Sequence, residues 1–222
     1  MISFNRVSVQ RNDTMLIKDV TFTVETGEKA VIYGKSGSGK STILLTLVGA
    51  RTPSAGTIFF DGKNVSAENI GTIRRSVAFV LQEPVLGAPT VRESLLLPFT
   101  FAANKEDKPS LDTMKTVLER LHLPENILDK SSSVLSGGEK QRIAIARSLL
   151  LQKQVYVLDE VTSALDSESK KALLDLFANS RFTIISVSHD PDWFSICNKA
   201  IHINDGTVDH IGEKPLSDTK NP

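Results

Sequence analysis

Gly34-Lys35-Ser36-Gly37-Ser38-Gly39-Lys40-Ser41 is the stretch that decides the fold. It fits the pattern G-x-x-x-x-G-K-[ST]. It stands between an apolar run, Glu28–Tyr33, that predicts a buried strand and a run, Thr42–Val48, that predicts a helix ended by Gly49. The glycines let successive backbone N–H groups point inward at the start of a helix, where the dipole favours negative charge. In this pattern Lys40 reaches the β- and γ-phosphates and the Ser41 hydroxyl ligates Mg²⁺, so the stretch predicts a nucleotide site. A glycine-rich turn without a ligand is the alternative.

The composition limits the class of protein. The chain has 222 residues, of which 40% are hydrophobic, enough for one domain or two intimate subdomains. Lys plus Arg and Asp plus Glu both number 26, so the net charge is zero and we expect no nucleic-acid partner. No apolar run approaches the roughly 20 residues that span a bilayer, and the first residues do not resemble a signal peptide. Cys197, the only cysteine, is expected to be a small buried hydrophobe. We therefore expect a cytoplasmic protein that can dock on a membrane protein.

Residue patterns predict different structures along the chain. The first third favours short strands, the middle favours a helix after a polar loop, and the last third alternates strand and helix. The predicted strands are Ile2–Val9, Val20–Glu25, Thr57–Asp61, Val77–Leu81, Gln154–Leu158 and Phe182–Val187, and the predicted helices include Ser110–His122 and Ser167–Phe177. Loops or turns are expected at Pro53–Gly56, Asn104–Pro109 and Ser131–Ser133, and a loose tail at 214–222. The continuous apolar strands of the last third are typical of a parallel sheet that is covered on both faces.

Each apolar strand after the first third ends near a side chain that can handle phosphate, metal or water: Gln82, Asp159, Glu160 and His189. In open parallel α/β sheets, ligands bind beyond the carboxyl ends of the strands, so these residues can converge on one site. Asp159 could hold Mg²⁺, and Glu160 could orient the attacking water and accept its proton. The Gln82 amide could touch both the metal and the water, and His189 could donate a hydrogen bond to the γ-phosphate. Each of these residues alone has an ordinary structural explanation, and their order along the chain strengthens the joint interpretation.

A second glycine-rich helix start follows far along the chain, at Leu135-Ser136-Gly137-Gly138-Glu139. Ser136 and Glu139 have the spacing of a capping box, and Ile143, Ala146 and Leu150 mark the buried stripe of the helix that follows. A plain cap needs no glycines, which cost up to about 1 kcal/mol each relative to alanine. Gly137 and Gly138 therefore predict an anion at this helix start, with a flexible start as the alternative. Together with the first site, this predicts that two copies of the chain share each nucleotide.

At this point the chain closely resembles the nucleotide-binding subunit of the ATP-binding cassette (ABC) family, from about Ile2 to Gly212. The matching motifs are the Walker A loop at Gly34–Ser41, the Q-loop at Gln82, the signature at Leu135–Glu139, Walker B at Val155–Glu160, the D-loop at Ser163–Asp166 and the switch histidine at His189. The resemblance implies a single α/β domain over 1–222. It comprises a RecA-like parallel-sheet core, an antiparallel β-subdomain and an inserted α-helical subdomain at roughly 85–150. It also implies an ATP hydrolase that works as a head-to-tail dimer.

The resemblance assigns roles residue by residue. The implied catalytic residues are Glu160, His189 and Gln82, and the implied Mg²⁺ ligands are Ser41, Gln82 and Asp159. The implied ATP-binding residues are Gly34, Lys35, Ser36, Gly37, Ser38, Gly39, Lys40, Ser41, Thr42, Arg11, Ser136, Gly137, Gly138 and Asp166. Arg11 is included because the family usually has an aromatic residue near Gln10 or Arg11, and a guanidinium plane can stack on adenine in its place.

Within the family, the chain looks most like small stand-alone ATPases of the bacterial iron-export type. We therefore expect an integral membrane permease as a second partner, with the chain peripheral on the cytoplasmic face of the inner or plasma membrane. The permease is expected to grip the apolar Pro84–Val91 stretch, with Val85 and Leu86 exposed, although ordinary packing would explain that stretch equally well. The rival is a soluble single-cassette ATPase of the iron–sulfur cluster assembly type, and a regulator without turnover is a third class.

Overall fold

Two β-sheets organise residues 1–213, the part of the chain that the computed structural model describes. The predicted loose tail, 214–222, lies outside the described residues. The larger sheet has the strand order β10-β9-β3-β8-β7-β6, formed by Thr207–Gly212, Lys199–Asn204, Lys29–Tyr33, Thr183–Val187, Val155–Asp159 and Val77–Val80. The smaller sheet has the order β2-β1-β4-β5, formed by Thr14–Val24, Ile2–Arg11, Ala55–Phe60 and Lys63–Asn64. The larger sheet is parallel from β9 to β6, and the smaller one is antiparallel, which confirms the predicted α/β fold class.

The central strands β3, β7 and β8 of the larger sheet are buried on both faces, as their apolar sequences predict. Along β3, Ala30 and Ile32 belong to one core cluster, whereas Val31 between them belongs to the other. The same alternation occurs on β7, where Tyr156 and Val157 belong to opposite clusters. Because successive side chains of a strand point to opposite faces, a strand between two cores is apolar at most positions.

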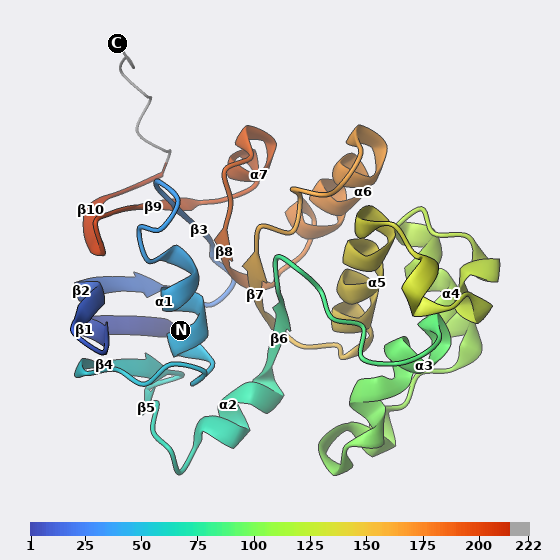
Figure 1. Ribbon diagram of the computed structural model, residues 1–222, viewed down its shortest axis with the longest axis horizontal. Helices are drawn as coiled ribbons and strands as arrows, with labels where there is room; N and C mark the ends of the chain where they lie inside the picture. Colours follow the sequence, from blue (N-terminus) through green and yellow to red (C-terminus); the bar gives the residue numbers. More distant parts are fainter. Residues whose placement is uncertain (214–222) are drawn as a thin grey trace.

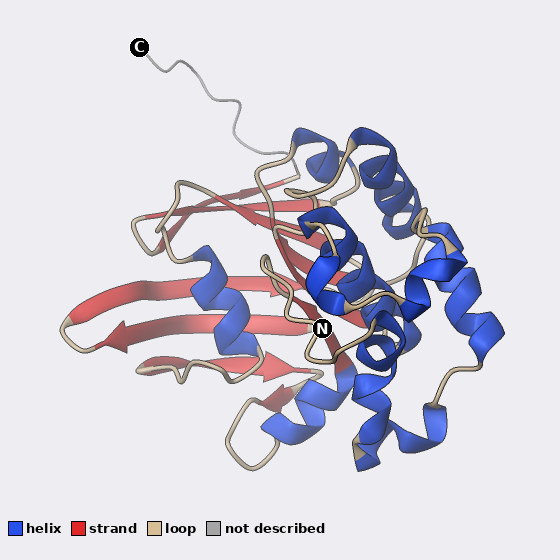
Figure 2. Cartoon of the chain, turned by 45° about the vertical axis from the view of Figure 1, so that its right-hand side comes forward, coloured by secondary structure: helices blue, strands red, loops and turns tan. Residues whose placement is uncertain are grey.

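The seven α-helices of the described chain lie on both sides of the larger sheet. In Figure 1 the antiparallel strands β1, β2 and β4 lie at one end of the molecule, α3 and α4 lie at the other, and α5 stands between α4 and the sheet. Figure 2 shows most of the helices gathered on one side of the strands. The α-helices are α1 (Lys40–Leu47), α2 (Ile70–Ser76), α3 (Val91–Leu96), α4 (Leu111–Arg120), α5 (Gly137–Leu150), α6 (Ser167–Ala178) and α7 (Pro191–Ser195). Four 3₁₀ helices, η1 (Leu97–Thr100), η2 (Ala102–Asp107), η3 (Glu125–Asp129) and η4 (Ser132–Val134), connect the helices of the middle third.

The helices between 91 and 150 share one hydrophobic core with the sheet. Leu95 of α3, Leu118 of α4 and Ile143 of α5 belong to the same buried cluster as Val31 and Leu158 of the sheet. Because this core is continuous, it marks no boundary, and the division at roughly 85–150 stays a prediction.

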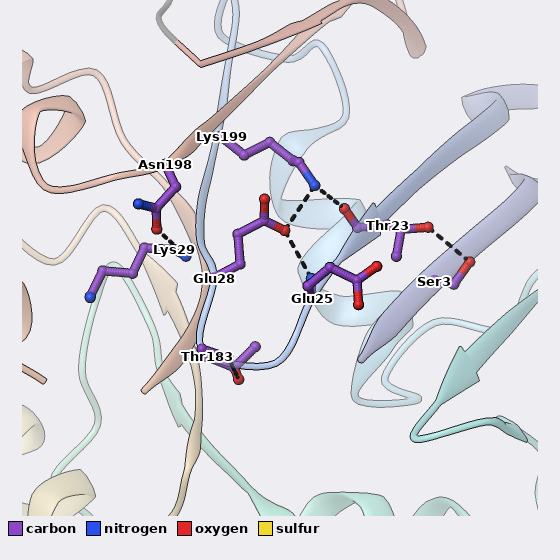
Figure 3. A network of polar contacts seen from close by, with 9 residues as sticks. Ser3, Thr23, Glu25, Glu28, Lys29, Thr183, Asn198 and Lys199 are labelled. Atoms are coloured by element: carbon purple, nitrogen blue, oxygen red, sulfur yellow. Dashed lines mark hydrogen bonds and ion pairs between the residues drawn. The ribbon is translucent and has the colours of Figure 1, made fainter. Parts of the chain in front are cut away.

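A polar network ties the two sheets together at the end opposite the carboxyl ends of the parallel strands (Figure 3). The Lys199 ammonium of β9 donates to the carbonyl of Thr23 in β2 at 2.7 Å and to the Glu28 carboxylate at 2.8 Å. The same carboxylate accepts from the backbone N–H of Glu25 at 2.8 Å, which closes the turn between β2 and β3. This partly buried ion pair links the end of β2 to the residue before β3, and β3 leads directly to Gly34.

The structure differs from the sequence-based prediction in several segments. The loop expected at Ser131–Ser133 overlaps the 3₁₀ helix η4, in which the Ser131 hydroxyl accepts from the Ser133 N–H. Strand β2 begins at Thr14, before the predicted Val20, because a hairpin with Asn12 at φ 52° pairs Thr14 with Arg11. Ala55 and Gly56 belong to β4 and not to a turn, because Gly56 (φ 79°) lies at an irregularity of the β1–β4 pairing, where a Cβ atom would stand 2.1 Å from the Arg6 carbonyl oxygen. The predicted polar loop from Asn104 is for the most part the 3₁₀ helix η2.

Candidate ATP site

A cavity of about 460 Å³ opens where the parallel strands end. Four strands (β3, β6, β7 and β8) run parallel, so their carboxyl ends meet at one edge of the sheet. The cavity is lined by Leu16, Ser36, Gly37, Gly39, Lys40, Ser41, Thr42, Gln82, Glu160 and His189. The structure thus brings together residues that lie far apart in the sequence, since Leu16 and His189 are separated by more than three quarters of the chain.

Two glycines of the phosphate loop, Gly34 and Gly39, are required by close approaches of other parts of the chain. Gly34 has φ 142°, and a Cβ atom there would lie 2.0 Å from the carbonyl oxygen of Ile203 in β9. Gly39 has φ 100°, and a Cβ atom there would lie 2.6 Å from the carbonyl oxygen of Leu16. Gly39 is also the N-cap of α1 and supplies no side-chain acceptor, so the first N–H groups of the helix remain available to an anion.

The Lys40 side chain turns back onto the start of the phosphate loop. Its ammonium donates to the carbonyl oxygens of Gly34 and Lys35, both at 2.8 Å. Burial lowers the pKa of Lys40, and the nearby carboxylates of Glu160 and Asp159 act in the opposite direction. The ammonium is therefore held over the phosphate loop by acceptors that a phosphate can replace.

Asp159 and Ser41 form the part of the site that suits a cation. Asp159 is 6% exposed, and its Oδ1 atom has no hydrogen-bond partner within the described chain. Burial raises the pKa of this carboxyl, while a hydrogen bond from Ser41 opposes the shift. A carboxylate with a free buried oxygen next to a hydroxyl fits a hard divalent cation such as Mg²⁺.

Glu160 stands between Gln82 and His189. The Gln82 amide Nε2 donates to Glu160 Oε2 at 3.3 Å, and His189 Nε2 lies 3.6 Å from Glu160 Oε1. The backbone of Glu160 has φ 46°, an uncommon conformation for this residue type, and its N–H donates to the Val187 carbonyl of β8 at 2.9 Å. Such backbone strain persists only where the surroundings hold it, and it is concentrated at functional sites. The arrangement presents one carboxylate with two neighbours that can orient it.

The signature segment lies elsewhere. Ser136 caps α5 in the predicted capping box, with its hydroxyl accepting from the Glu139 N–H at 3.2 Å and the Glu139 carboxylate accepting from the Ser136 N–H at 2.8 Å. Ser136, Gly137 and Gly138 are not among the residues that line the cavity of this chain. The capping box is confirmed, and the start of α5 does not contribute to the cavity that holds this chain's own phosphate loop.

The two signature glycines have different structural roles, which the sequence did not separate. A Cβ atom at Gly137 would meet nothing within 4 Å, whereas one at Gly138 would stand 2.8 Å from the carbonyl oxygen of Ala164. Gly138 is therefore needed for the packing of the Ser163–Asp166 segment, and only Gly137 leaves open space. Asp166 caps α6 by accepting from the Ser169 N–H at 2.9 Å, so a structural role accompanies the ATP contact predicted for it.

These roles lead to a stability prediction. Gly138→Ala is expected to lower the free energy of unfolding by about 1–3 kcal/mol, because its methyl group would overlap a backbone oxygen. Gly137→Ala is the matched control, and it is expected to raise stability by about 0.5–1 kcal/mol, because alanine costs less helix entropy than glycine. Urea unfolding of both variants measures the difference, and equal stabilities would show that the Ala164 contact does not restrict position 138.

Arg11, which the sequence suggested as the adenine contact, lies apart from the cavity. Arg11 is exposed at the end of β1, opposite Thr14, and it is not among the lining residues. Leu16 of β2 lines the cavity instead. Sequence reasoning missed Leu16 because it missed the first half of β2, although the Asn12-Asp13 pair after an apolar strand is a hairpin signal.

The fold and the cavity define a phosphate-loop ATPase of the cassette type. The chain belongs to the ABC transporter family, whose model matches residues 17–163. It is 36% identical over 217 residues to the energy-coupling factor transporter ATP-binding protein EcfA1 of Lactiplantibacillus plantarum, covering 93% of this chain and 75% of that protein. It is 32% identical over 217 residues to the "Probable iron export ATP-binding protein FetA" of Escherichia coli K12, covering 96% of this chain and 93% of that protein.

Solved structures agree with this assignment. The chain matches a dimeric post-hydrolysis state of the ATP-binding cassette MJ0796 bound to ADP and Pi with a TM-score of 0.84 and 26% identity, over 96% of this chain and 98% of that one. It also matches a bacterial Atm1-family ABC exporter with ATP bound, with a TM-score of 0.85 and 26% identity, over 96% of this chain and 38% of that one. The protein is thus an ATP-binding and ATP-hydrolysing subunit of an ABC transporter. No helix within residues 1–213 is long and apolar enough to cross a bilayer.

Proposed function

We propose that this subunit powers a transporter by forming an ATP-driven head-to-tail dimer and by docking on a separate membrane permease. The observation that carries the proposal is the separation of the two glycine elements. The cavity of one chain contains the phosphate loop, Gln82, Glu160 and His189, but not the start of α5. The exposed start of α5 is then available to cover a nucleotide that a second copy holds.

In this proposal, the cavity residues carry out hydrolysis. Lys40 and the N–H groups of the phosphate loop bind the β- and γ-phosphates. Glu160 orients a water molecule and takes its proton as the water oxygen bonds to the γ-phosphorus, while the bond to the β–γ bridging oxygen breaks and ADP leaves with that electron pair. His189 and Gln82 hold the Glu160 carboxylate and the transferred oxygens in place. Ser41, Gln82 and Asp159 would hold Mg²⁺, which when bound neutralises phosphate charge.

The docking surface that we propose lies just after Gln82. Val85 is 73% exposed, and it borders a hollow that Pro84, Gly87, Pro89, Ser131 and Ser133 also line. Leu86, which the sequence suggested would be exposed as well, is only 5% exposed because its side chain joins the core of α3 and α5. The expectation for Leu86 is therefore wrong, and Val85 is the large apolar side chain of this pair that is offered to a partner. We place this contact on the cytoplasmic face of the inner or plasma membrane, and a metal such as iron is the cargo that the likeness to FetA supports.

The docking proposal leads to a pull-down prediction. Tagged protein is expected to bring down a multi-span membrane protein from detergent extracts, and Val85→Asp is expected to weaken that association about tenfold or more, because it buries a charge in an apolar contact. Ile211→Asp, at an exposed aliphatic side chain on β10, is the matched control and should leave the association unchanged. Both variants should bind ATP as well as the natural protein. Recovery of soluble iron–sulfur assembly proteins in place of a membrane protein would favour the rival class.

A further inference from the structure

Two side chains of helix α5 donate hydrogen bonds to the two ends of the segment 81–86, which carries Gln82. At the start of this segment, Gln141 Nε2 donates to the carbonyl oxygen of Leu81 at 3.5 Å. At its end, the Arg147 guanidinium donates to the carbonyl oxygens of Val85 and Leu86. The backbone positions of Gln141 and Arg147 lie about 9 Å apart along the helix axis, at 1.5 Å of rise per residue. The loop between β6 and α3, which contains this segment, accordingly passes across α5 in Figure 1.

The Arg147 guanidinium holds the segment at two points. Nη1 donates to Leu86 O at 2.8 Å and Nη2 donates to Val85 O at 3.0 Å, so one planar fork holds two successive carbonyl groups. Burial lowers the pKa of the Arg147 guanidinium, and the oxygens that receive its hydrogen bonds are neutral. A half-buried charge that donates to neutral oxygens is stable only while the geometry of these hydrogen bonds is kept.

The carbonyl of Leu86 is fixed from a second direction. The Ser94 hydroxyl of α3, fully buried, donates to Leu86 O at 3.0 Å and lies 3.4 Å from Arg147 Nη1. The side chain of Leu86 is buried in the same region, whereas Val85 points outward. The segment is thus held by its carbonyl groups and by Leu86, and it presents Val85 on the other side.

We propose that Arg147 is a positioning residue that fastens the segment after Gln82 to α5, so that the start of α5, Gln82 and Val85 move as one unit. At one end of this unit is Ser136, the N-cap of α5, and at the other is the exposed Val85. Gln82 lies between them and donates to Glu160 at 3.3 Å. The inference rests on the proposed function only for the identity of what touches Ser136 and Val85.

The first test uses the free subunit and needs no permease. A nitroxide is attached to Val85→Cys in a Cys197→Ser background, and its mobility is read from the electron paramagnetic resonance line shape. Arg147→Met keeps an unbranched stem but removes the fork, and it is expected to shorten the nitroxide correlation time about threefold or more, because the segment loses two charge-assisted hydrogen bonds. The correlation time in Arg147→Lys should lie between those of Arg147→Met and the protein with the natural arginine, because an ammonium cannot reproduce the planar fork. Arg92→Met, at an exposed arginine of α3 paired with Asp129, should match the natural protein.

The second test adds the membrane protein recovered with the tagged chain. Arg147→Met is expected to lower the kcat of the permease-stimulated ATPase about tenfold and to leave the KM for ATP within about twofold, because it alters the link and not the phosphate loop. Arg147→Lys should restore part of that kcat. If Arg147→Met fails to fold, Arg147→Lys and Ser94→Ala are measured in its place. Both are expected to shorten the nitroxide correlation time and to lower the stimulated kcat.

The outcomes separate this inference from the proposed function. An unchanged line shape in folded Arg147→Met overturns the positioning role, whatever the partner is. A mobile segment with an unchanged stimulated kcat overturns the coupling of the segment to turnover. Failure to recover any membrane protein contradicts the proposed function, and the line shape of the free subunit still decides the role of Arg147.

Discussion

Glu160→Gln is expected to lower ATP turnover by about 10²–10⁴-fold while ATP binding is kept. The substitution preserves the shape of the side chain that lies between Gln82 and His189, but an amide cannot accept the proton of the attacking water. Lys40 and the phosphate loop, which bind the phosphates, remain intact. Because hydrolysis no longer ends the ATP-bound state, the dimer should also accumulate.

Three measurements check this prediction: the steady-state ATPase rate, the equilibrium binding of ATP, and the elution of the protein with and without ATP in size-exclusion chromatography. Glu119→Gln, at an exposed glutamate of α4, is the control for loss of a carboxylate elsewhere. A steady-state rate close to that of the natural protein would remove Glu160 from the role of base.

A mixture of two inactive variants is expected to regain roughly a quarter of the natural ATPase activity. Lys40→Ala removes the phosphate-binding ammonium of one cavity, and Ser136→Arg blocks the start of α5. In a head-to-tail dimer of one copy of each, one site carries both defects and the other carries neither. With random pairing, half of the dimers are mixed and each has one intact site of two. The recovered activity would be smaller if hydrolysis at one site required hydrolysis at the other.

The structure supplies a matched negative control for this experiment. Lys40 and Glu160 line the same cavity of the same chain, so a mixture of Lys40→Ala with Glu160→Gln leaves one defect in each site of a mixed dimer. That mixture should stay inactive. Unfolding curves of Ser136→Arg are also needed, because loss of this N-cap costs about 1 kcal/mol. Mixed dimers with independent sites and no recovered activity would contradict the shared site.

The parts of the site that the sequence predicts are local or follow from one general rule. The phosphate loop is local, because glycine spacing, the following Lys40 and the flanking strand and helix all lie within about twenty residues. The meeting of Gln82, Glu160 and His189 was predicted because parallel strands share one carboxyl edge, and the cavity confirms it. The capping box at Ser136 was also predicted correctly, since a cap depends on residues only three positions apart.

The sequence alone determined the class of fold, the nucleotide loop and the residues at the strand ends, because these depend on short-range spacing and on apolar periodicity. Only the tertiary structure decided that Leu86 is buried while Val85 is exposed, that Gly138 packs on the Ala164 carbonyl, and that Arg147 holds the segment after Gln82. Each of these facts joins parts of the chain that are far apart or depends on which face of a loop meets another element. No spacing within one segment encodes such a contact, since it exists only after α3, α5 and the sheet have packed into one core.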